Sequence, residues 1–398
     1  MSHLRYFTAG ESHGQALVGI IEGVPAGLEI SEEYIAAQLY RRQQGHGRGG
    51  RMRIERDHAR IVSGVRFGRT LGSPIALEIA NRDWQNWQTK MAVVANEHTA
   101  QVARVEIPRP GHADLAGVLK YQTDDIRNVL ERASARETTT RVALGSIARK
   151  FLESFGVGFV SHVMQIHEAR SATTLLDYDT NNAAFDLKKI NERAEASSVR
   201  CLDEKNEAAM IAAIDRAQEA RDTVGGIFEV AAFHLPVGLG SHTQWDRRLD
   251  ARIAAAMMSI PAMKGVEIGD GFSNATRRGS LVHDQIYFSH ERGYYRSSNN
   301  AGGLEGGITN GQPLVVRVAM KPISTLMRPL DSVNMRTKAA TAAHIERSDV
   351  CAVPAACVIG EAMLALVLAD AVLEKFGGDS MTEIQTRWEQ WMAAYKQN

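Results

Sequence analysis

Apolar and polar positions along the chain predict short strands and amphipathic helices in mixed order. The run QALVGIIEGV at 15–24 predicts a strand, and SEEYIAAQLYRRQQ at 31–44 predicts a helix with Ser31 as its N-cap. Segments 60–66 and 75–80 predict a strand pair joined by FGRTLGSP, and 124–156 predicts a long helix, continuous or interrupted, that Gly156 ends. Further strands are expected at 157–166, 226–233 and 313–320, and further helices at 204–221, 246–259, 350–376 (closed by FGG) and 382–395.

The order of these elements indicates the fold class. Strands occur in neighbouring pairs as often as they alternate with helices, which favours α+β over a regular parallel sheet. No fixed-period repeat and no linker rich in proline and serine divides the chain. We therefore expect one domain over residues 1–398.

Composition narrows the class of protein. The chain has 398 residues, 44% of them hydrophobic, and its 46 basic and 46 acidic residues cancel, so no chain-wide field favours a nucleic-acid partner. Three cysteines without C-x-x-C spacing suggest neither a disulfide framework nor a metal site. The start lacks the apolar run of a signal peptide, and Glu361 and Asp370 interrupt the most apolar segment. We expect a cytoplasmic protein that does not enter a membrane.

Charge is concentrated in one segment, which contains the run QQGHGRGGRMR. Seven of the chain's 35 arginines lie within 41–60, against Glu55 and Asp57. Gly45, Gly47 and Gly50 match the dinucleotide pattern G-x-G-x-x-G, but a predicted helix precedes them where that motif needs a strand. A loop that binds a small anion, an Arg/Gly nucleic-acid tail and a solvated basic face remain as alternatives.

Two histidines occupy loops that suit acid–base chemistry. Residues 10–14, GESHG, match the G-x-S-x-G elbow of serine hydrolases, yet Ser12 lies near the N-terminus and precedes a predicted strand. That position disfavours a nucleophile and leaves His13 as a titratable group in a loop, with a structural role as the alternative. His112 lies in IPRPGHADLAG, where Pro108 and Pro110 stiffen the backbone, and it could equally hydrogen-bond within its own loop.

Three further stretches carry possible ligand contacts. In ERASARETTTR, Arg132 and Arg136 are four apart and predicted to share a helical face, or to pair on the surface with Glu131 or Glu137. GGLEGGITNGQP at 302–313 is rich enough in glycine to approach a ligand closely, and it leads through a strand to KPIST. IERSDVCAVPAA places Asp349 before an apolar helix, where an N-cap is the simplest interpretation.

Together these motifs resemble one family. RYFTAGESHG, RRQQGHGRGGRM, RPGHADL, ERASARETT, GGITNGQP, MKPIST and ERSD occur in the order and approximate spacing typical of chorismate synthase, from about residue 5 to about residue 376. The resemblance implies a β-α-β sandwich with helices between antiparallel sheets, assembled as a homotetramer. It also implies conversion of 5-enolpyruvylshikimate 3-phosphate to chorismate with reduced FMN, in the biosynthesis of aromatic amino acids.

The resemblance also implies roles for individual residues. His13 would protonate or hydrogen-bond the departing phosphate, His112 would support protonation of the reduced flavin anion, Asp349 would help flavin N5 accept the substrate proton, and Ser12 and Ser134 could relay protons. The residues implied to hold the substrate are Arg42, Arg48, Arg51, Arg109, Arg136 and Arg347. Those implied to contact FMN are Arg132, Ala133, Ser134, Pro261, Ala262, Gly306, Lys321, Pro322, Ile323, Ser324, Thr325 and Arg347.

The chain departs from the commonest family pattern at four positions. Ala133 replaces a frequent serine, Pro261 a frequent asparagine and Ser324 a frequent proline, and Val350 follows Asp349 where proline is common. Pro261 removes a backbone N–H and a polar side chain, so the flavin contact there is expected to be the weakest. The chain contains no separate nicotinamide domain, so we expect NADPH to act only indirectly, through an external flavin reductase.

Overall fold

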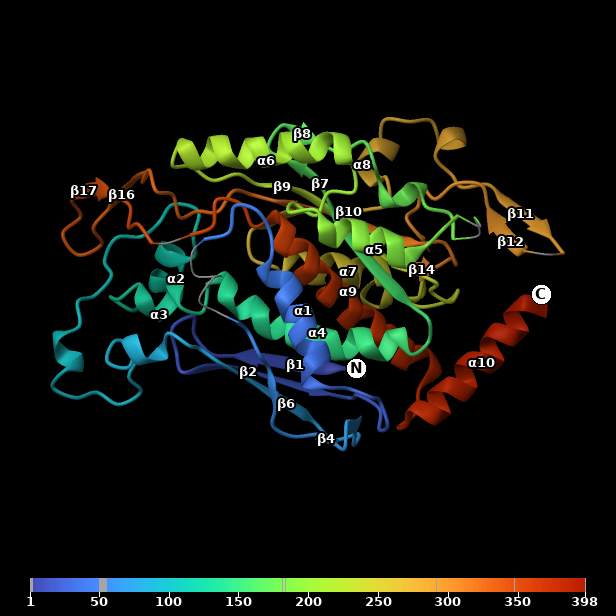
Figure 1. Ribbon diagram of the computed structural model, residues 1–398, viewed down its shortest axis with the longest axis horizontal. Coiled ribbons are helices and arrows are strands. Elements are labelled where there is room, and N and C mark those ends of the chain that lie inside the picture. Colours follow the sequence, from blue (N-terminus) through green and yellow to red (C-terminus); the bar gives the residue numbers. More distant parts are fainter. Residues whose placement is uncertain are drawn as a thin grey trace.

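The computed structural model describes residues 3–49, 56–180, 182, 184–290, 292–346 and 348–397, with side chains described as far as 394. Two antiparallel sheets enclose a layer of helices, and Figure 1 shows this layer between them. The four-stranded sheet has the order β1 (Arg5–Ala9), β2 (Ala16–Glu22), β6 (Ile75–Ala80), β3 (Arg60–Ile61). The five-stranded sheet has the order β10 (Met263–Ile268), β15 (Leu314–Met320), β9 (Gly226–Phe233), β7 (Gly158–Ile166), β8 (Ala169–Arg170). The β-α-β sandwich expected for the α+β class is confirmed.

The central helices are α1 (Glu32–Gln43), α4 (Thr138–Glu153), α7 (Leu249–Met258) and α9 (Val353–Phe376). The outer helices are α2 (Asp114–Tyr121), α3 (Arg127–Leu130), α5 (Leu187–Ala196), α6 (Glu204–Glu219), α8 (Gly271–Asn274) and α10 (Met381–Gln397). The small hairpins are β4 (Val65–Arg66) with β5 (Arg69–Thr70), β11 (Ile286–Ser289) with β12 (Gly293–Arg296), β13 (Leu304–Glu305) with β14 (Ile308–Thr309), and β16 (Asp331–Val333) with β17 (Ala340–Ala342). In Figure 1, α2, α3 and the β16–β17 hairpin lie at one end of the sandwich, and β11, β12 and α10 at the other.

Most predicted elements are present within a few residues of their expected bounds. Helix α1 begins after Ser31, whose hydroxyl accepts a hydrogen bond from Tyr34 N at 3.2 Å, as an N-cap should. The segment 124–156 is interrupted: α3 ends at Leu130, a 3₁₀ turn η4 spans Ala135–Glu137, and α4 follows. Helix α7 begins three residues later than expected because a 3₁₀ turn, η6 (Trp245–Arg247), precedes it.

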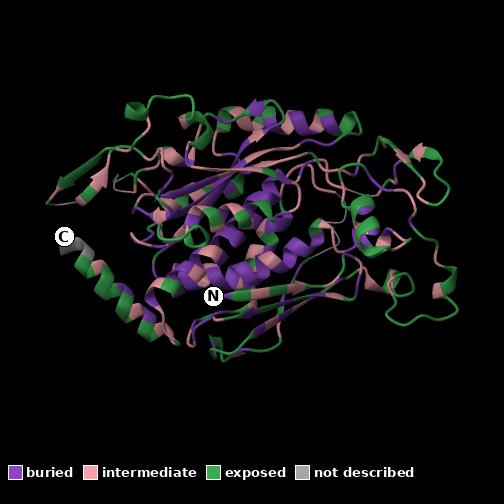
Figure 2. Ribbon diagram, turned by 180° about the vertical axis from the view of Figure 1, so that it is seen from behind, coloured by how far each residue is buried: buried purple, intermediate pink, exposed green. Residues whose placement is uncertain are grey.

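Strand β9 shows how the core is divided. Phe228, Val230 and Ala232 point to the helical layer, whereas Ala231 and Phe233 point to a second apolar cluster beneath α5. Successive side chains of a strand point to opposite faces of the sheet. An apolar cluster covers each face of β9, so the strand is buried on both sides. Figure 2 accordingly shows buried residues on the central helices and on the strands next to them.

Helix α9 is the centre of the helical layer. A Cβ added to Gly145 of α4 would lie 2.5 Å from Ala362 Cβ. The two helices can therefore approach this closely at that point only because residue 145 is glycine. Its composition and length would allow α9 to cross a membrane, but 89% of its most apolar 18-residue window is buried inside the protein. The helix therefore fits the core of this fold.

Glu361 of α9 is buried among arginines from several elements. Arg41 donates to its two carboxylate oxygens at 2.7 and 2.9 Å, Arg149 also pairs with it, and Ser161 Oγ lies 2.5 Å away. Burial opposes ionisation of Glu361, but Arg41 and Arg149 outweigh it and hold the pKa well below the usual carboxyl range. This cluster joins α1, α4, α9 and β7 in the interior.

Candidate active site

Two buried arginines from different elements face one carboxylate. Arg42 lies in the last turn of α1 and Arg136 in η4, and each is about 5% exposed or less. Arg136 Nη1 is 2.5 Å from Asp57 Oδ1, and Arg42 Nη1 is 3.6 Å from Asp57 Oδ2. Arg136 also donates through Nε and Nη2 to Asn81 Oδ1, at 3.2 and 3.0 Å. Asp57 therefore pairs with both arginines.

Arg48 adds a third cation in the glycine segment after α1. Its Nη1 is 2.7 Å from Asp349 Oδ2, and Gly49 N donates to Asp349 Oδ1 at 2.6 Å. Burial, opposed by Asp57 and reinforced by the charges of Arg48 and Arg136, lowers the pKa of Arg42 to about 10. Arg42 Nη1 is buried and has no hydrogen-bond partner among the described residues. A group that still lacks an acceptor and feels excess positive charge is suited to an anionic ligand.

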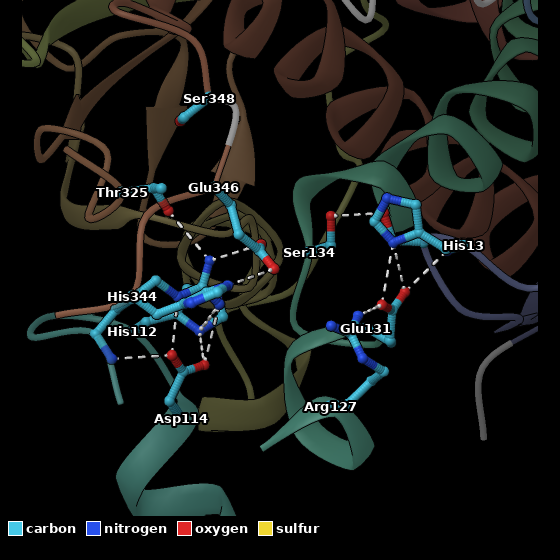
Figure 3. A network of polar contacts seen from close by, with 12 residues as sticks. His13, His112, Asp114, Arg127, Glu131, Ser134, Thr325, His344, Glu346 and Ser348 are labelled. Atoms are coloured by element: carbon cyan, nitrogen blue, oxygen red, sulfur yellow. Dashed lines mark hydrogen bonds and ion pairs between the residues drawn. The ribbon is translucent and has the colours of Figure 1, made fainter. Parts of the chain in front are cut away.

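His13 is held by a buried carboxylate at the turn between β1 and β2. Glu131 accepts from His13 N at 2.8 Å and lies 3.0 Å from His13 Nδ1, while Arg127 Nη1 donates to Glu131 at 2.9 Å (Figure 3). Burial raises the pKa of Glu131, but the hydrogen bonds from His13 and the charge of Arg127 leave it below its usual value. Because an ionised carboxylate faces Nδ1, the proton of the neutral imidazole belongs there. Ser134 Oγ donates to Ser12 Oγ at 3.2 Å beside this network.

His112 belongs to a second network, at the start of α2. Its Nδ1 is 2.5 Å from Asp114 Oδ1, and Arg109 Nε donates to Asp114 Oδ2 at 2.8 Å (Figure 3). Burial raises the pKa of Asp114, but His112 and Arg109 outweigh it and hold the pKa well below the usual range. Arg109 Nη1 also reaches Thr325 Oγ1 at 3.1 Å and Glu346 at 3.2 Å. Arg109 thus ties the His112 loop to the segment that follows β15.

In that segment, Lys321–Thr325, the residues from Lys321 to Ser324 border a cavity of about 640 Å³. Lys321 N donates to Ala262 O at 3.0 Å, which brings the turn at Pro261 and Ala262 beside it. Gly111 faces the same segment, because a Cβ there would lie 3.5 Å from Ser324 Cβ. Burial and the charge of Lys264 lower the pKa of Lys321. Lys321, which lines this cavity, offers a positive charge to a phosphate group.

Comparison with known proteins identifies the family. The family model for chorismate synthase matches residues 4–373. The chain belongs to the chorismate synthase family.

The relatives match over nearly their whole length. A chorismate synthase of Geobacter sulfurreducens is 56% identical over 399 aligned residues, and one of Aquifex aeolicus is 55% identical over 392, each covering 98% of both chains. A solved structure titled "Crystal Structure of Chorismate Synthase" aligns with a TM-score of 0.79 at 47% identity and covers 99% of both chains. The protein is a chorismate synthase, a carbon–oxygen lyase of aromatic amino-acid biosynthesis.

Two expectations about the chorismate synthase motifs are wrong in the structure. Asp349 does not cap α9, because the helix begins later and its N-cap is Ala352. The chain between them is held against the glycine segment, where Val350 N donates to Gly47 O at 2.8 Å. Arg132 and Arg136 do not share a helical face or pair with Glu131 or Glu137, because residues 131–134 are not helical. Arg132 donates to Thr8 O at 2.8 Å and Gly10 O at 3.1 Å, whereas Arg136 points to Asp57.

Gly306 is not brought to the other residues implied to contact the flavin. It lies in the β13–β14 turn, before β15, whereas Lys321–Thr325 follow the far end of that seven-residue strand. At about 3.3 Å per residue, β15 separates the two by about 20 Å within one chain. Arg51 and Arg347 lie outside the described residues, and Ala133 lies next to the Arg132 and Ser134 contacts.

Several acidic partners in the site were not singled out from the sequence. Asp57 was counted only as a charge in the basic segment, Glu131 only as a surface partner of arginines, and Asp114 and Glu346 not at all. Of these partners, Asp114 lies only two residues after His112, which it contacts, so its spacing was a local signal for the pair. The three cysteines, Cys201, Cys351 and Cys357, are free and buried, and burial raises the pKa of Cys351 and Cys357 to about 12.

Proposed function

We propose that this enzyme eliminates phosphate from 5-enolpyruvylshikimate 3-phosphate in an anti-1,4 reaction and so forms chorismate, with reduced FMN bound beside the substrate. The allylic C–O bond to phosphate breaks, a proton leaves from the other end of the allylic system, and the electron pair of that C–H bond completes the new diene. Reduced FMN, when bound, supplies electron density to the allylic system and recovers it, so the reaction is redox-neutral overall. The chain's own residues bind, orient and exchange protons.

The arginine cluster carries the proposal. The substrate bears two carboxylates and a phosphate, about four negative charges near neutral pH. Arg42, Arg48 and Arg136 lie together beside Asp57 and Asp349, and burial together with the charges of the other two arginines lowers the pKa of Arg42, so an anionic substrate would relieve the repulsion among these cations. We assign substrate binding to these three arginines, with Arg51, Arg109 and Arg347 by resemblance.

His13 is placed to assist the leaving group. With Nδ1–H donating to Glu131, the protonated form of the ring can deliver a proton or hydrogen bond from Nε2 to phosphate, which lowers the charge that develops on departure. Ser12 and Ser134, in contact with each other, offer a proton path beside it.

Asp349 and His112 are assigned to the other proton. Arg48 and Gly49 N orient the Asp349 carboxylate, which we assign to helping N5 of the bound flavin accept the substrate proton. Asp114 orients His112, and the contact of Arg109 with Thr325 places this loop against the proposed flavin segment. We assign His112 to the control of protonation there.

The flavin would be held by Arg132–Ser134, by Pro261 and Ala262, and by Lys321–Thr325, with Arg347 at the junction with the substrate. Gly306 could reach the flavin of the same chain only if the β13–β14 turn moved. We also propose that the enzyme is a homotetramer, in which Gly306 could instead reach the flavin of another chain. We further propose a single catalytic domain, a cytoplasmic location, and flavin reduced by an external reductase, with NADPH acting only through it.

One anaerobic experiment tests the function. Purified protein is incubated with 5-enolpyruvylshikimate 3-phosphate, with and without reduced FMN, and released phosphate and chorismate are measured together. Equal amounts of both products, formed only with reduced flavin, are expected. Phosphate release without flavin would instead favour a hydrolase. A parallel assay in air with NADPH and FMN, without reductase or dithionite, should show no turnover if reduction is external.

A further inference from the structure

An aromatic side chain that no motif above includes contacts His13. The imidazole of His13 stacks on the indole of Trp87, with ring centroids 3.8 Å apart and planes 22° from parallel. Trp87 directly follows the 3₁₀ turn η2 (Trp84–Asn86), and its Nε1 donates to Asp83 Oδ2 at 2.9 Å. The indole is therefore anchored at its edge while its face meets the imidazole.

His13 is thus restrained in two independent directions. Glu131 engages Nδ1, but a hydrogen bond at one nitrogen does not by itself fix the tilt of the ring about that contact. The indole face removes this freedom because a parallel stack fixes the plane of the ring. Together the two contacts fix the direction in which Nε2 points.

The same indole interacts with neighbouring cations. Arg127, which pairs with Glu131, has its guanidinium carbon 5.1 Å from the Trp87 ring centroid, and Lys90 Nζ lies 5.0 Å from it. An aromatic face attracts cations, so Trp87 also stabilises the Arg127 side chain that steadies Glu131. Trp87 supports His13 directly by stacking and indirectly through the Arg127–Glu131 pair.

We propose that Trp87 is a positioning residue that keeps His13 aligned for proton delivery to the leaving phosphate. The proposal rests on the proposed function for the role of His13, but the stack itself is a property of the free protein. Two separate measurements follow from this distinction.

The first measurement uses no substrate. Histidine labelled with ¹³C at Cε1 is incorporated, and the His13 signal is assigned from its loss in His13→Ala. In the wild-type protein the ring current of Trp87 should shift the His13 Cε1 proton upfield, and Trp87→Leu should remove that shift. Trp84→Leu is the matched control, since Trp84 belongs to the same turn and should leave the signal in place. A His13 signal that is unchanged in Trp87→Leu would overturn the proposal, whatever reaction the enzyme performs.

The second measurement is a double-mutant cycle on single-turnover phosphate release. Trp87→Leu should slow phosphate release about 3- to 10-fold with little change in substrate KM. Trp87→Phe should restore most of the release rate. In Trp84→Leu the release rate should stay within about twofold of wild type. In a His13→Ala background, Trp87→Leu should have no further effect, because its contribution passes through His13. An equal loss in both backgrounds, or no loss in the wild-type background, would overturn the positioning role. Absence of flavin-dependent release from the wild type would instead reject the proposed function, and the spectroscopic result would stand.

Discussion

Replacing Arg48 by alanine tests the central electrostatic argument. The side chain is about one-tenth exposed and its Nη1 lies 2.7 Å from Asp349, so its charge is largely shielded from water. Beside Arg42 and Arg136 it belongs to a cluster of three cations, in which burial, together with its charge and that of Arg136, lowers the pKa of Arg42. A hydrogen bond to a charged group contributes about 1.5–3 kcal/mol, so Arg48→Ala should weaken substrate binding by about 10- to 150-fold. FMN binding should change by less than about threefold, because Lys321–Thr325, not Arg48, is assigned to the flavin.

The assay is calorimetric titration of each ligand separately. Oxidised FMN and the substrate are titrated in turn, without reductant, so that no turnover occurs. Arg48→Lys should give an intermediate loss, because lysine keeps the charge but not the planar fork. Arg60→Ala is the matched control: Arg60 belongs to the same basic segment, but its side chain is 65% exposed and pairs with Glu78 on the surface. Equal losses of substrate and FMN affinity in Arg48→Ala would refute the assignment of this loop to the substrate.

Three further changes test other parts of the molecule. Asp114→Asn should lower kcat about 100-fold, because the amide cannot orient His112 as the ionised carboxylate does; a change below about twofold in steady-state kcat would contradict this. Lys321→Gln should weaken FMN binding about tenfold in a fluorescence titration and leave substrate affinity unchanged, whereas an unaltered flavin affinity would remove Lys321 from that site. Glu361→Gln should lower the free energy of unfolding by about 3–5 kcal/mol in urea, since it leaves buried arginines without their counter-charge; a loss below about 1 kcal/mol would show that the cluster relaxes. The pKa of Glu361 is lower in the folded state than in the unfolded state. The contribution of Glu361 to the free energy of unfolding is therefore complete above the ordinary pKa of a carboxyl group and is lost as the pH falls from there toward the folded-state pKa. Glu361→Gln should accordingly lose less stability in acid than the wild-type protein does.

Local sequence signals were sufficient for the family and for most of the long helices and strands, but not for β1, β10, α2, α5 or the hairpins β11–β12, β13–β14 and β16–β17. The Ser31 cap, the strand-like run at 226–233 and the glycines after Phe376 act over a few residues, so neighbouring positions alone specify them. The helical interpretation failed at 131–134, where the chain turns so that Arg132 and Arg136 reach different partners. Helical spacing could not predict that turn, because contacts far along the chain decide it.

The sequence by itself determined which residues carry charge and protons, the α+β class, and the motifs that mark the family. Only the tertiary structure decided how those residues are paired. Glu131 meets His13 across 118 residues of chain and Asp57 meets Arg136 across 79, so no local spacing could reveal either pair. The same holds for Trp87, whose stacking on His13 depends on how the loops at this end of the sandwich fold together. Burial then decides the chemistry, because a carboxylate or guanidinium removed from water takes its protonation state from the partners that the fold supplies.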